Sequence, residues 1–324
     1  MVRGLRRRAF VVLGMHRSGT SALTRVLALL GAELPRTLIG AGAGNPLGHW
    51  ESQPICDLND RILKAAGSTW YDWRAIDESF LSSSELTAFE PEARAILAEE
   101  FGDARTIVLK DPRICRLYPF WRQVLDSLDI QPMPILPLRH PAEVAASLEA
   151  RDGMHPALGQ IIWLRHVLDA ERFTRHSPRV VTTFDSLLGA WEGVAHRIAE
   201  CFEVSMDGSA TADSIGSFLS ADQRHHAESA ATSVLPEWVD ASYQGLLALE
   251  KGVEKADILG TLTDIEAKLR ASEGCFAPIT TAAIAVGLQA RRIAARLQEA
   301  EAELARLRTE SGGLSTSHST SGSP

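Results

Sequence analysis

Short apolar runs alternate with longer stretches of helical periodicity along the first two thirds of the chain. Four runs have the length and continuous apolar character of buried strands, at residues 9–14, 106–109, 133–138 and 179–184. A helical pattern follows each run, at 20–30, 114–128 and 141–150, and after Phe184 through Cys201. Continuously apolar strands separated by helices are typical of a parallel sheet covered on both faces. The pattern therefore predicts an α/β fold whose ligands bind beyond the carboxyl ends of the strands.

The remaining segments define the expected domain organisation. We expect an α/β domain over residues 1–250, a helical extension over 251–310, and a disordered Ser/Thr/Gly-rich tail over 311–324. The Gly/Ala/Pro-rich stretch 35–50 is too long for an ordinary connection, which favours a substrate loop.

The helical extension carries an apolar stripe. Its members alternate at spacings of four and three, which predicts a short heptad seam with weak coiled-coil character; they are Val286, Ala290, Ile293, Leu297, Ala300, Leu304 and Leu307. The stripe is compatible both with packing back onto the domain and with a homodimer formed through this helix.

Composition excludes several classes. The formal net charge of −8 argues against a nucleic-acid partner, which needs a basic face over many phosphates. The four cysteines are far apart in sequence, so neither a zinc site nor a disulfide framework is predicted, and a reducing compartment fits. The apolar runs 9–15 and 279–288 are shorter than the ~20 residues of a membrane span, and no signal-peptide cleavage site follows the basic start. We therefore expect a cytoplasmic protein without a membrane span.

The strongest local motif lies between the first strand and its helix. Residues 14–21 read Gly-Met-His-Arg-Ser-Gly-Thr-Ser. A glycine turn leading into a helix N-terminus directs backbone N–H groups at an anion, and the helix dipole favours negative charge. The spacing of Gly14 and Gly19 matches the NTPase P-loop, but Thr20 stands where that motif requires lysine. The motif predicts a P-loop-like phosphate site whose basic side chain is Arg17.

A second anion motif follows the third strand. Arg139 lies where that strand ends, and Ser147 and Arg151 follow one turn apart on one helix face. Guanidinium and hydroxyl groups that converge on one point suit a terminal phosphate. Taken alone, the motif is also compatible with an ordinary helix start and surface arginines.

Together the two motifs resemble those of sulfotransferases that use 3′-phosphoadenosine-5′-phosphosulfate (PAPS). The similarity is to the branch that includes tyrosylprotein sulfotransferases and many bacterial sulfotransferase-family proteins, and it extends with decreasing clarity from Phe10 to about Phe202. The resemblance implies that PAPS is the cosubstrate, that no metal is needed, and that adenosine 3′,5′-bisphosphate is released. It assigns the 5′-phosphosulfate to Arg17, Ser18, Gly19, Thr20 and Ser21, and the 3′-phosphate to Arg139, Ser147 and Arg151.

The resemblance is incomplete further along the chain. Phe184 stands where relatives carry a tyrosine, so a nucleotide hydrogen bond from that hydroxyl is not expected here. Residues 224–226, Arg-His-His, fit either the family's C-terminal basic contact or a solvated loop.

Catalytic candidates are also carried over from the family. Arg17 is placed to stabilise the leaving phosphate, and Lys110 belongs to a Lys-Asp-Pro segment similar to that of the tyrosylprotein branch. Glu51 corresponds to the family's glutamate base, and His49 competes for that role because imidazole titrates near neutral pH. The alternatives are an ion pair between Lys110 and Asp111, and a simple charge–dipole interaction of Glu51 at a helix N-terminus.

Aromatic residues cluster near these candidates in the sequence. They form either a sugar-stacking wall or anchors of the core and loops, and they are Trp50, Trp70, Tyr71 and Trp73.

The leading hypothesis is a sulfotransferase that acts on a hydroxyl of a glycan or a small molecule such as a metabolite. One alternative is a P-loop kinase or NTPase, which Thr20 in the lysine position disfavours. Another is an inactive nucleotide-binding assembly protein whose C-terminal helix is the functional part.

Overall fold

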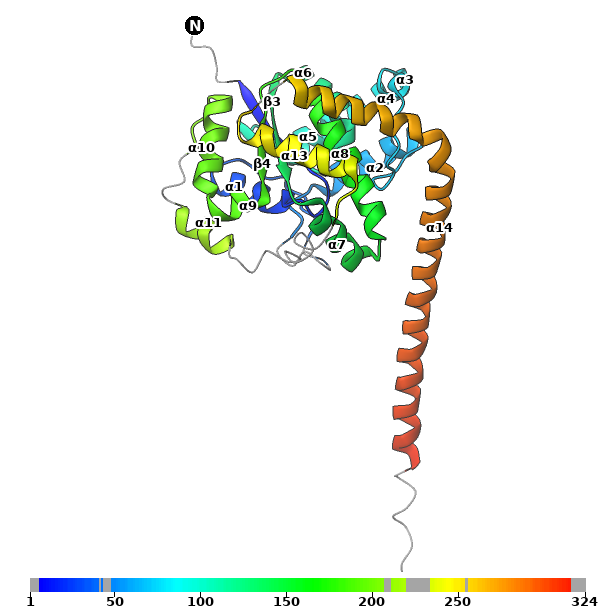
Figure 1. The fold of residues 1–324 in the computed structure, drawn as a ribbon. Coiled ribbons are helices and arrows are strands. Elements are labelled where there is room, and N and C mark those ends of the chain that lie inside the picture. Colours follow the sequence, from blue (N-terminus) through cyan, green and yellow to red (C-terminus); the bar gives the residue numbers. More distant parts are fainter. Residues whose placement is uncertain are drawn as a thin grey trace, which may run out of the picture. The chain divides into compact units, whose positions relative to one another are not determined.

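A parallel four-stranded sheet forms the centre of the fold in the computed structural model, which describes residues 6–40, 42, 48–206, 211–219, 234–253 and 256–315. The strands lie in the order β2-β1-β3-β4 (Figure 1). Their bounds are β1 (Arg7–Val12), β2 (Thr106–Lys110), β3 (Ile130–Leu138) and β4 (Val180–Thr183). All four strands were predicted from the apolar runs, and the α/β prediction is confirmed.

The register places the carboxyl ends of the strands together. Val12 of β1 pairs with Lys110 of β2 and with Ile135 of β3. The segments that follow β1, β2 and β3 therefore leave the sheet at one edge, which is where open parallel sheets bind ligands.

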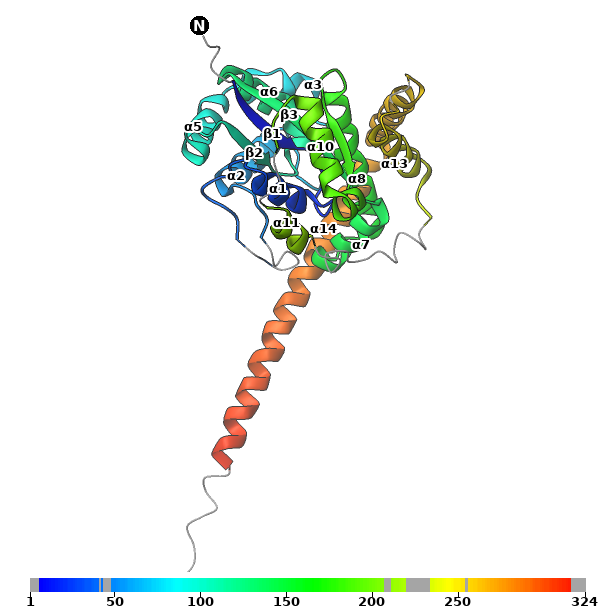
Figure 2. The same ribbon diagram turned by 90° about the vertical axis from the view of Figure 1, so that its left-hand side faces the viewer.

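Helices cover both faces of the sheet (Figure 2). In chain order they are α1 (Thr20–Leu29), α2 (Gln53–Ala65), α3 (Glu78–Leu81), α4 (Ser84–Thr87), α5 (Glu90–Phe101), α6 (Ile114–Ser127), α7 (Pro141–Asp152), α8 (Pro156–Thr174), α9 (Phe184–Gly189), α10 (Trp191–Phe202), α11 (Ala212–Phe218), α13 (Glu237–Glu250) and α14 (Ala256–Ser315). Alternate strand residues such as Phe10 and Val12 join α1 and α10 in one core, while α6 and α8 contact β3. Burial of these apolar faces stabilises the fold.

Two helical predictions differ from the structure. The helix expected after Phe184 and through Cys201 breaks at Ala190, whose φ of −155° and ψ of 56° are not helical, so α9 and α10 are separate. The apolar pattern did not predict α8, most of which is buried against α6 and α7. Charged residues such as Arg165 and Asp169 are buried along with its apolar residues, so the helix lacks a clear amphipathic period.

The chain divides into two compact units, Met1–Ala271 and Ser272–Pro324. The first unit includes the beginning of α14, where Leu262, Ile265 and Leu269 are buried. Spacings of three and four place these side chains on one helix face. The second unit consists of the rest of α14, which continues to Ser315, and residues 316–324 of the predicted tail lie outside the described residues.

The expectation that no segment spans a membrane stays a prediction, because one helix is a candidate by length and composition. Over the described residues, α14 from Ala256 to Leu307 is long and apolar enough to cross a bilayer. The apolar run 279–288 is short, but the helix continues around it with alanine, threonine and glycine, which extend the weakly charged stretch. Length and composition by themselves are weak support for a membrane span.

Candidate functional site

The loop between β1 and α1 has the backbone of an anion cradle. Gly19 caps α1 with φ 82°, and Arg17 also has a positive φ, of 68°. A side chain on Gly14 would not fit, since a Cβ there would lie 2.7 Å from Cγ2 of Thr20, the first residue of α1. Ser18 is 1% exposed, and no group among the described residues hydrogen-bonds its Oγ. An unpaired buried hydroxyl at a helix N-terminus fits an anionic ligand as its partner.

Gly19 is the position of this loop that is most sensitive to substitution. We expect Gly19→Ala to lower the free energy of unfolding by about 2 to 5 kcal/mol, from left-handed strain and overpacking together. A Cβ there would lie 2.4 Å from Cδ2 of Phe184 in a residue with φ +82°. Urea denaturation measures the change, and Gly193→Ala in α10, where a Cβ meets open space, is the control. Equal stability of the Gly19→Ala variant and the wild type would contradict the prediction.

A cluster of cationic side chains adjoins this loop. Arg17 Nε donates a hydrogen bond to Ser147 Oγ at 2.7 Å, which joins the loop to α7. Arg139 donates to the carbonyl oxygen of Arg17 at 3.3 Å and pairs with Glu143 at 2.7 Å. Burial lowers the pKa of Arg17, and the positive charges of Arg151 and Arg139 lower it further. Mutual repulsion among these buried and partly buried cations is relieved when an anion binds between them.

Arg151 belongs to the same region with other contacts. It pairs with Asp152 at 2.5 Å, and its guanidinium carbon lies 5.7 Å from the centre of the Trp70 ring. The two predicted anion motifs therefore lie together. Arg17 and Ser147 are in direct contact, whereas Arg151 contacts Asp152 and Trp70.

Lys110 connects the phosphate loop with the segment that precedes α2. Its Nζ donates to Ser21 Oγ at 3.3 Å, to the His49 carbonyl oxygen at 3.0 Å, and to Glu51 Oε1. Ser21 also donates to the His49 carbonyl oxygen at 3.1 Å. Lys110 and Glu51 are 4% and 5% exposed, so the pair is buried. The structure thus pairs Lys110 with Glu51 rather than with Asp111, and Glu51 is bound by a side chain rather than by a helix end alone.

His49 lies beside the same pair. Burial lowers its pKa, which the charge of Glu51 opposes and the charge of Lys110 reinforces. The imidazole is therefore neutral at physiological pH and able to accept a proton. Both candidates for the base lie at the edge of the phosphate loop.

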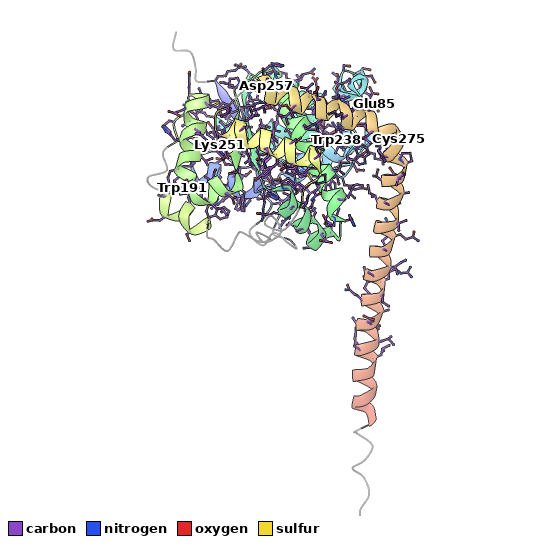
Figure 3. All side chains as sticks on the ribbon, in the orientation of Figure 1. Glu85, Trp191, Trp238, Lys251, Asp257 and Cys275 are labelled. Carbon is purple, nitrogen blue, oxygen red and sulfur yellow. The ribbon has the colours of Figure 1, made fainter. Side chains whose placement is uncertain are left out.

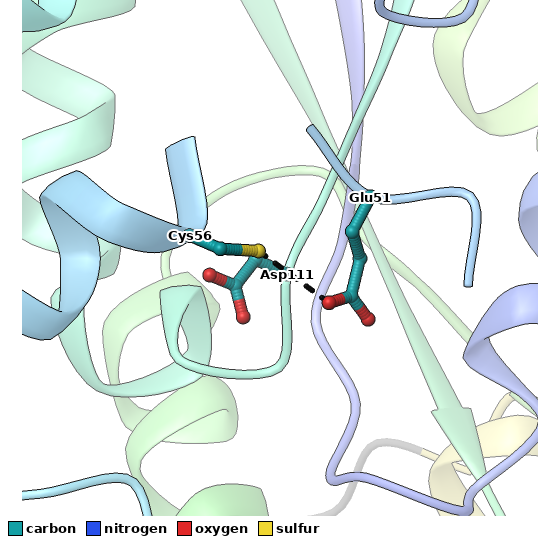
Figure 4. Close-up of side chains that lie close together, drawn as sticks. All are labelled: Glu51, Cys56 and Asp111. Atoms are coloured by element: carbon teal, nitrogen blue, oxygen red, sulfur yellow. Dashed lines mark hydrogen bonds between the residues drawn. The ribbon is translucent and has the colours of Figure 1, made fainter. Parts of the chain in front are cut away.

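Glu51, Cys56 and Asp111 form a buried group whose ligand atoms lie within 4.8 Å of one another (Figure 4). The Cys56 thiol donates to Glu51 Oε2 at 3.4 Å, and Asp111 accepts from Asn59 at 2.8 Å and from Arg113 at 3.0 Å. Burial raises the pKa of Cys56, with the charges of Asp111 and Glu51 adding to the effect. A protonated thiol is a poor metal ligand, and both carboxylates already have cationic or amide partners. We interpret the group as a hydrogen-bonded support for Glu51.

The aromatic residues predicted as a wall have different surroundings in the structure. Trp73 is 1% exposed and belongs to the core, and Arg25 lies 4.8 Å from the centre of the Trp50 ring. Trp70 contacts both Tyr71 and His16, with ring centres 5.4 and 4.6 Å apart. Trp70 and Tyr71 therefore remain candidates for an acceptor wall, whereas Trp73 is an anchor.

Two residues near the phosphate loop, His16 and Phe184, were not among the site residues predicted from the sequence. Burial lowers the pKa of His16 well below its usual value, with Arg113 and Arg151 adding to the effect, so this loop residue is neutral. Phe184 lies against Gly19, and Arg139 lies 5.0 Å from the centre of its ring. His16 lies within the loop motif 14–21 and Phe184 directly follows a strand, and these positions were the sequence signals that could have predicted them as site residues. The Arg-His-His segment at 224–226 lies outside the described residues.

The chain is similar to solved sulfotransferase domains. One is the sulfotransferase domain from the curacin biosynthetic pathway, with a TM-score of 0.39 and 13% identity over 82% of this chain and 98% of that chain. Another is the sulfotransferase domain from the Synechococcus PCC 7002 olefin synthase, with a TM-score of 0.40 and 16% identity over 80% of this chain and 94% of that chain. No family model and no curated protein matches the sequence. At this level of similarity, function has to be inferred from the residues of the site.

Proposed function

We propose that this protein is a PAPS-dependent sulfotransferase that transfers a sulfuryl group to a hydroxyl of a glycan or a small-molecule acceptor. The observation that carries the proposal is the hydrogen bond of 2.7 Å between Arg17 in the loop and Ser147 on α7. This bond joins the two predicted anion motifs, which supports the proposal because a nucleotide with phosphates at two positions offers an anion to each.

The residues present fit such a donor. The buried Ser18 hydroxyl and the N-terminus of α1 suit the 5′-phosphosulfate, with Thr20 and Ser21 in the first turn of the helix. Arg139 and Ser147 suit the 3′-phosphate, because a guanidinium can donate two parallel hydrogen bonds to its oxygens. Arg139 also donates to the carbonyl oxygen of Arg17, which holds its guanidinium beside the phosphate loop.

The donor supplies an activated sulfuryl group on its 5′-phosphate. The acceptor oxygen forms a bond to sulfur while the bond from sulfur to the bridging phosphate oxygen breaks. We assign removal of the acceptor proton to the Glu51 carboxylate, with His49 as the competing base. Arg17 and Lys110 neutralise the negative charge that develops on the leaving phosphate, as fixed cations do in phosphoryl transfer. The contacts of Lys110 with both Ser21 and Glu51 support this division of roles.

A P-loop kinase or NTPase is the second candidate, and two observations disfavour it. Thr20 occupies the position of the phosphate-binding lysine, and Asp111 is the aspartate available to hold Mg²⁺ after a strand. Asp111 is 0% exposed and accepts hydrogen bonds from Asn59 and Arg113. A metal would have to displace these partners.

Calorimetric titration with adenosine 3′,5′-bisphosphate, ATP and adenosine 5′-phosphate tests the proposal. We expect the bisphosphate to bind with a dissociation constant of about 1 to 10 μM and the other two at least about tenfold more weakly, because only the bisphosphate engages both motifs. Turnover is then measured with labelled PAPS and a panel of glycan and small-molecule alcohols. Equal binding of ATP with Mg²⁺ would favour the kinase, and bisphosphate binding without turnover on any acceptor would favour an inactive binding protein.

A further inference from the structure

The second unit carries an exposed apolar stripe. Within the described part of the helix from Ser272 onward, seven large hydrophobic side chains are more than half exposed. Cys275 is labelled near the beginning of this part in Figure 3. The exposed fractions are 67% for Val286, 60% for Ile293, 58% for Leu297, 54% for Leu304 and 51% for Leu307. Clustered aliphatic exposure on this scale marks a surface that another element covers.

The stripe follows a heptad register. Position a is occupied by Ala283, Ala290, Leu297 and Leu304, and position d by Val286, Ile293, Ala300 and Leu307. Apolar residues at a and d face the partner helix in a coiled coil, and the largest ones lie in the second half of this stretch. Pro278 lies inside α14, where a proline removes one backbone hydrogen bond and can kink the helix. The heptad register begins after this position, at Ala283.

The flanking charges indicate a second copy of the same helix. Arg296 lies at position g and Glu301 at position e, and both side chains are exposed. In a parallel, in-register coiled coil, a g residue faces the e residue five positions later on the other chain. Arg296 of each copy would therefore face Glu301 of the other. We propose that residues 283–307 form a parallel two-stranded coiled coil that makes this protein a homodimer.

The same charges make a membrane a poorer occupant. Residues 274–290 carry no Asp, Glu, Lys or Arg and lie at the short end of the lengths that span a bilayer. The half of the seam with the largest apolar residues also contains Arg292, Arg296, Glu299, Glu301 and Glu303. Apolar residues on one stripe with charges beside it are typical of a coiled coil. This inference is independent of the proposed function.

Sedimentation equilibrium of the full chain tests the seam. We expect a dimer at about 10 μM for the wild type, and an at least 100-fold weaker dimer for Leu297→Asp, because a charge would be buried at position a. Ala302→Asp, at the outward f position of the same helix, is the control and is expected to change the dissociation constant less than threefold. A monomeric wild type, or equal effects of both substitutions, would overturn the proposal.

Charge exchange tests the partner and its orientation. Arg296→Glu is expected to weaken the dimer about tenfold by placing like charges opposite each other, and Arg296→Glu combined with Glu301→Arg is expected to restore it. In a Cys275→Ser background, Ala300→Cys at position d is expected to form an interchain disulfide on mild oxidation, whereas Ala302→Cys is not. Failure of the double variant to recover, or equal crosslinking at both positions, would overturn the parallel arrangement.

A vesicle experiment tests whether a lipid surface, and not a second copy of the helix, covers the apolar stripe. The full chain is centrifuged with vesicles of zwitterionic and anionic phospholipid, and it is expected to stay in the supernatant as a dimer. If the wild type pellets with the vesicles and the Leu297→Asp variant does not, the stripe binds a lipid surface and the coiled coil is overturned.

Discussion

Replacing Arg139 with alanine is expected to weaken binding of adenosine 3′,5′-bisphosphate about 100-fold or more. Arg139 is 8% exposed and lies between Glu143 and the carbonyl oxygen of Arg17, so its guanidinium is held beside the phosphate loop. Truncating one partner of a buried, hydrogen-bonded charge pair costs about 2 to 5 kcal/mol. Calorimetry with the bisphosphate measures the loss.

Two comparisons make this result specific. Adenosine 5′-phosphate lacks the 3′-phosphate, so its weaker binding is expected to change less than about threefold in Arg139→Ala. Arg122→Ala removes an arginine whose side chain is 51% exposed, and it is expected to bind the bisphosphate as the wild type does. Equal losses for both nucleotides would mean that the substitution disturbs the loop generally, and the assignment of Arg139 to the 3′-phosphate would be wrong.

Replacing Glu51 with glutamine is expected to lower the turnover number by about 10² to 10⁴ while bisphosphate affinity changes little, as expected for a general base. Glutamine keeps the shape of the side chain and an oxygen that can accept from Lys110. Single-turnover transfer from labelled PAPS at saturating donor measures the effect once an acceptor is known.

His49→Gln provides the comparison for the base. We expect less than about a tenfold loss of turnover, because the imidazole would then be a neighbour and not the group that takes the proton.

The Glu51→Gln variant also needs a stability measurement, since removing one charge of a buried pair can cost about 3 to 5 kcal/mol. A retained rate in Glu51→Gln together with a large loss in His49→Gln would assign the base to His49.

Neighbouring residues carried most of the fold prediction. Continuous apolar runs gave all four strands, and the glycines and hydroxyls between the first strand and α1 marked the phosphate loop. Both signals are local, because a buried strand needs apolar side chains in succession and a tight anion loop needs residues that tolerate left-handed backbone. The helix α8 was not predicted because charged residues such as Arg165 and Asp169 are buried together with its apolar residues, which obscures the helical period.

The sequence by itself determined the α/β fold, the phosphate loop and the identity of the candidate side chains. The tertiary structure decided their partners: Lys110 pairs with Glu51 across 59 residues, and Arg17 bonds to Ser147 across 130 residues. It also decided that Trp73 belongs to the core and that the stripe of α14 is exposed within its own unit. The reason is physical, because a periodic pattern records which face of an element is apolar, whereas the choice of a charged partner depends on which elements the sheet brings to one edge.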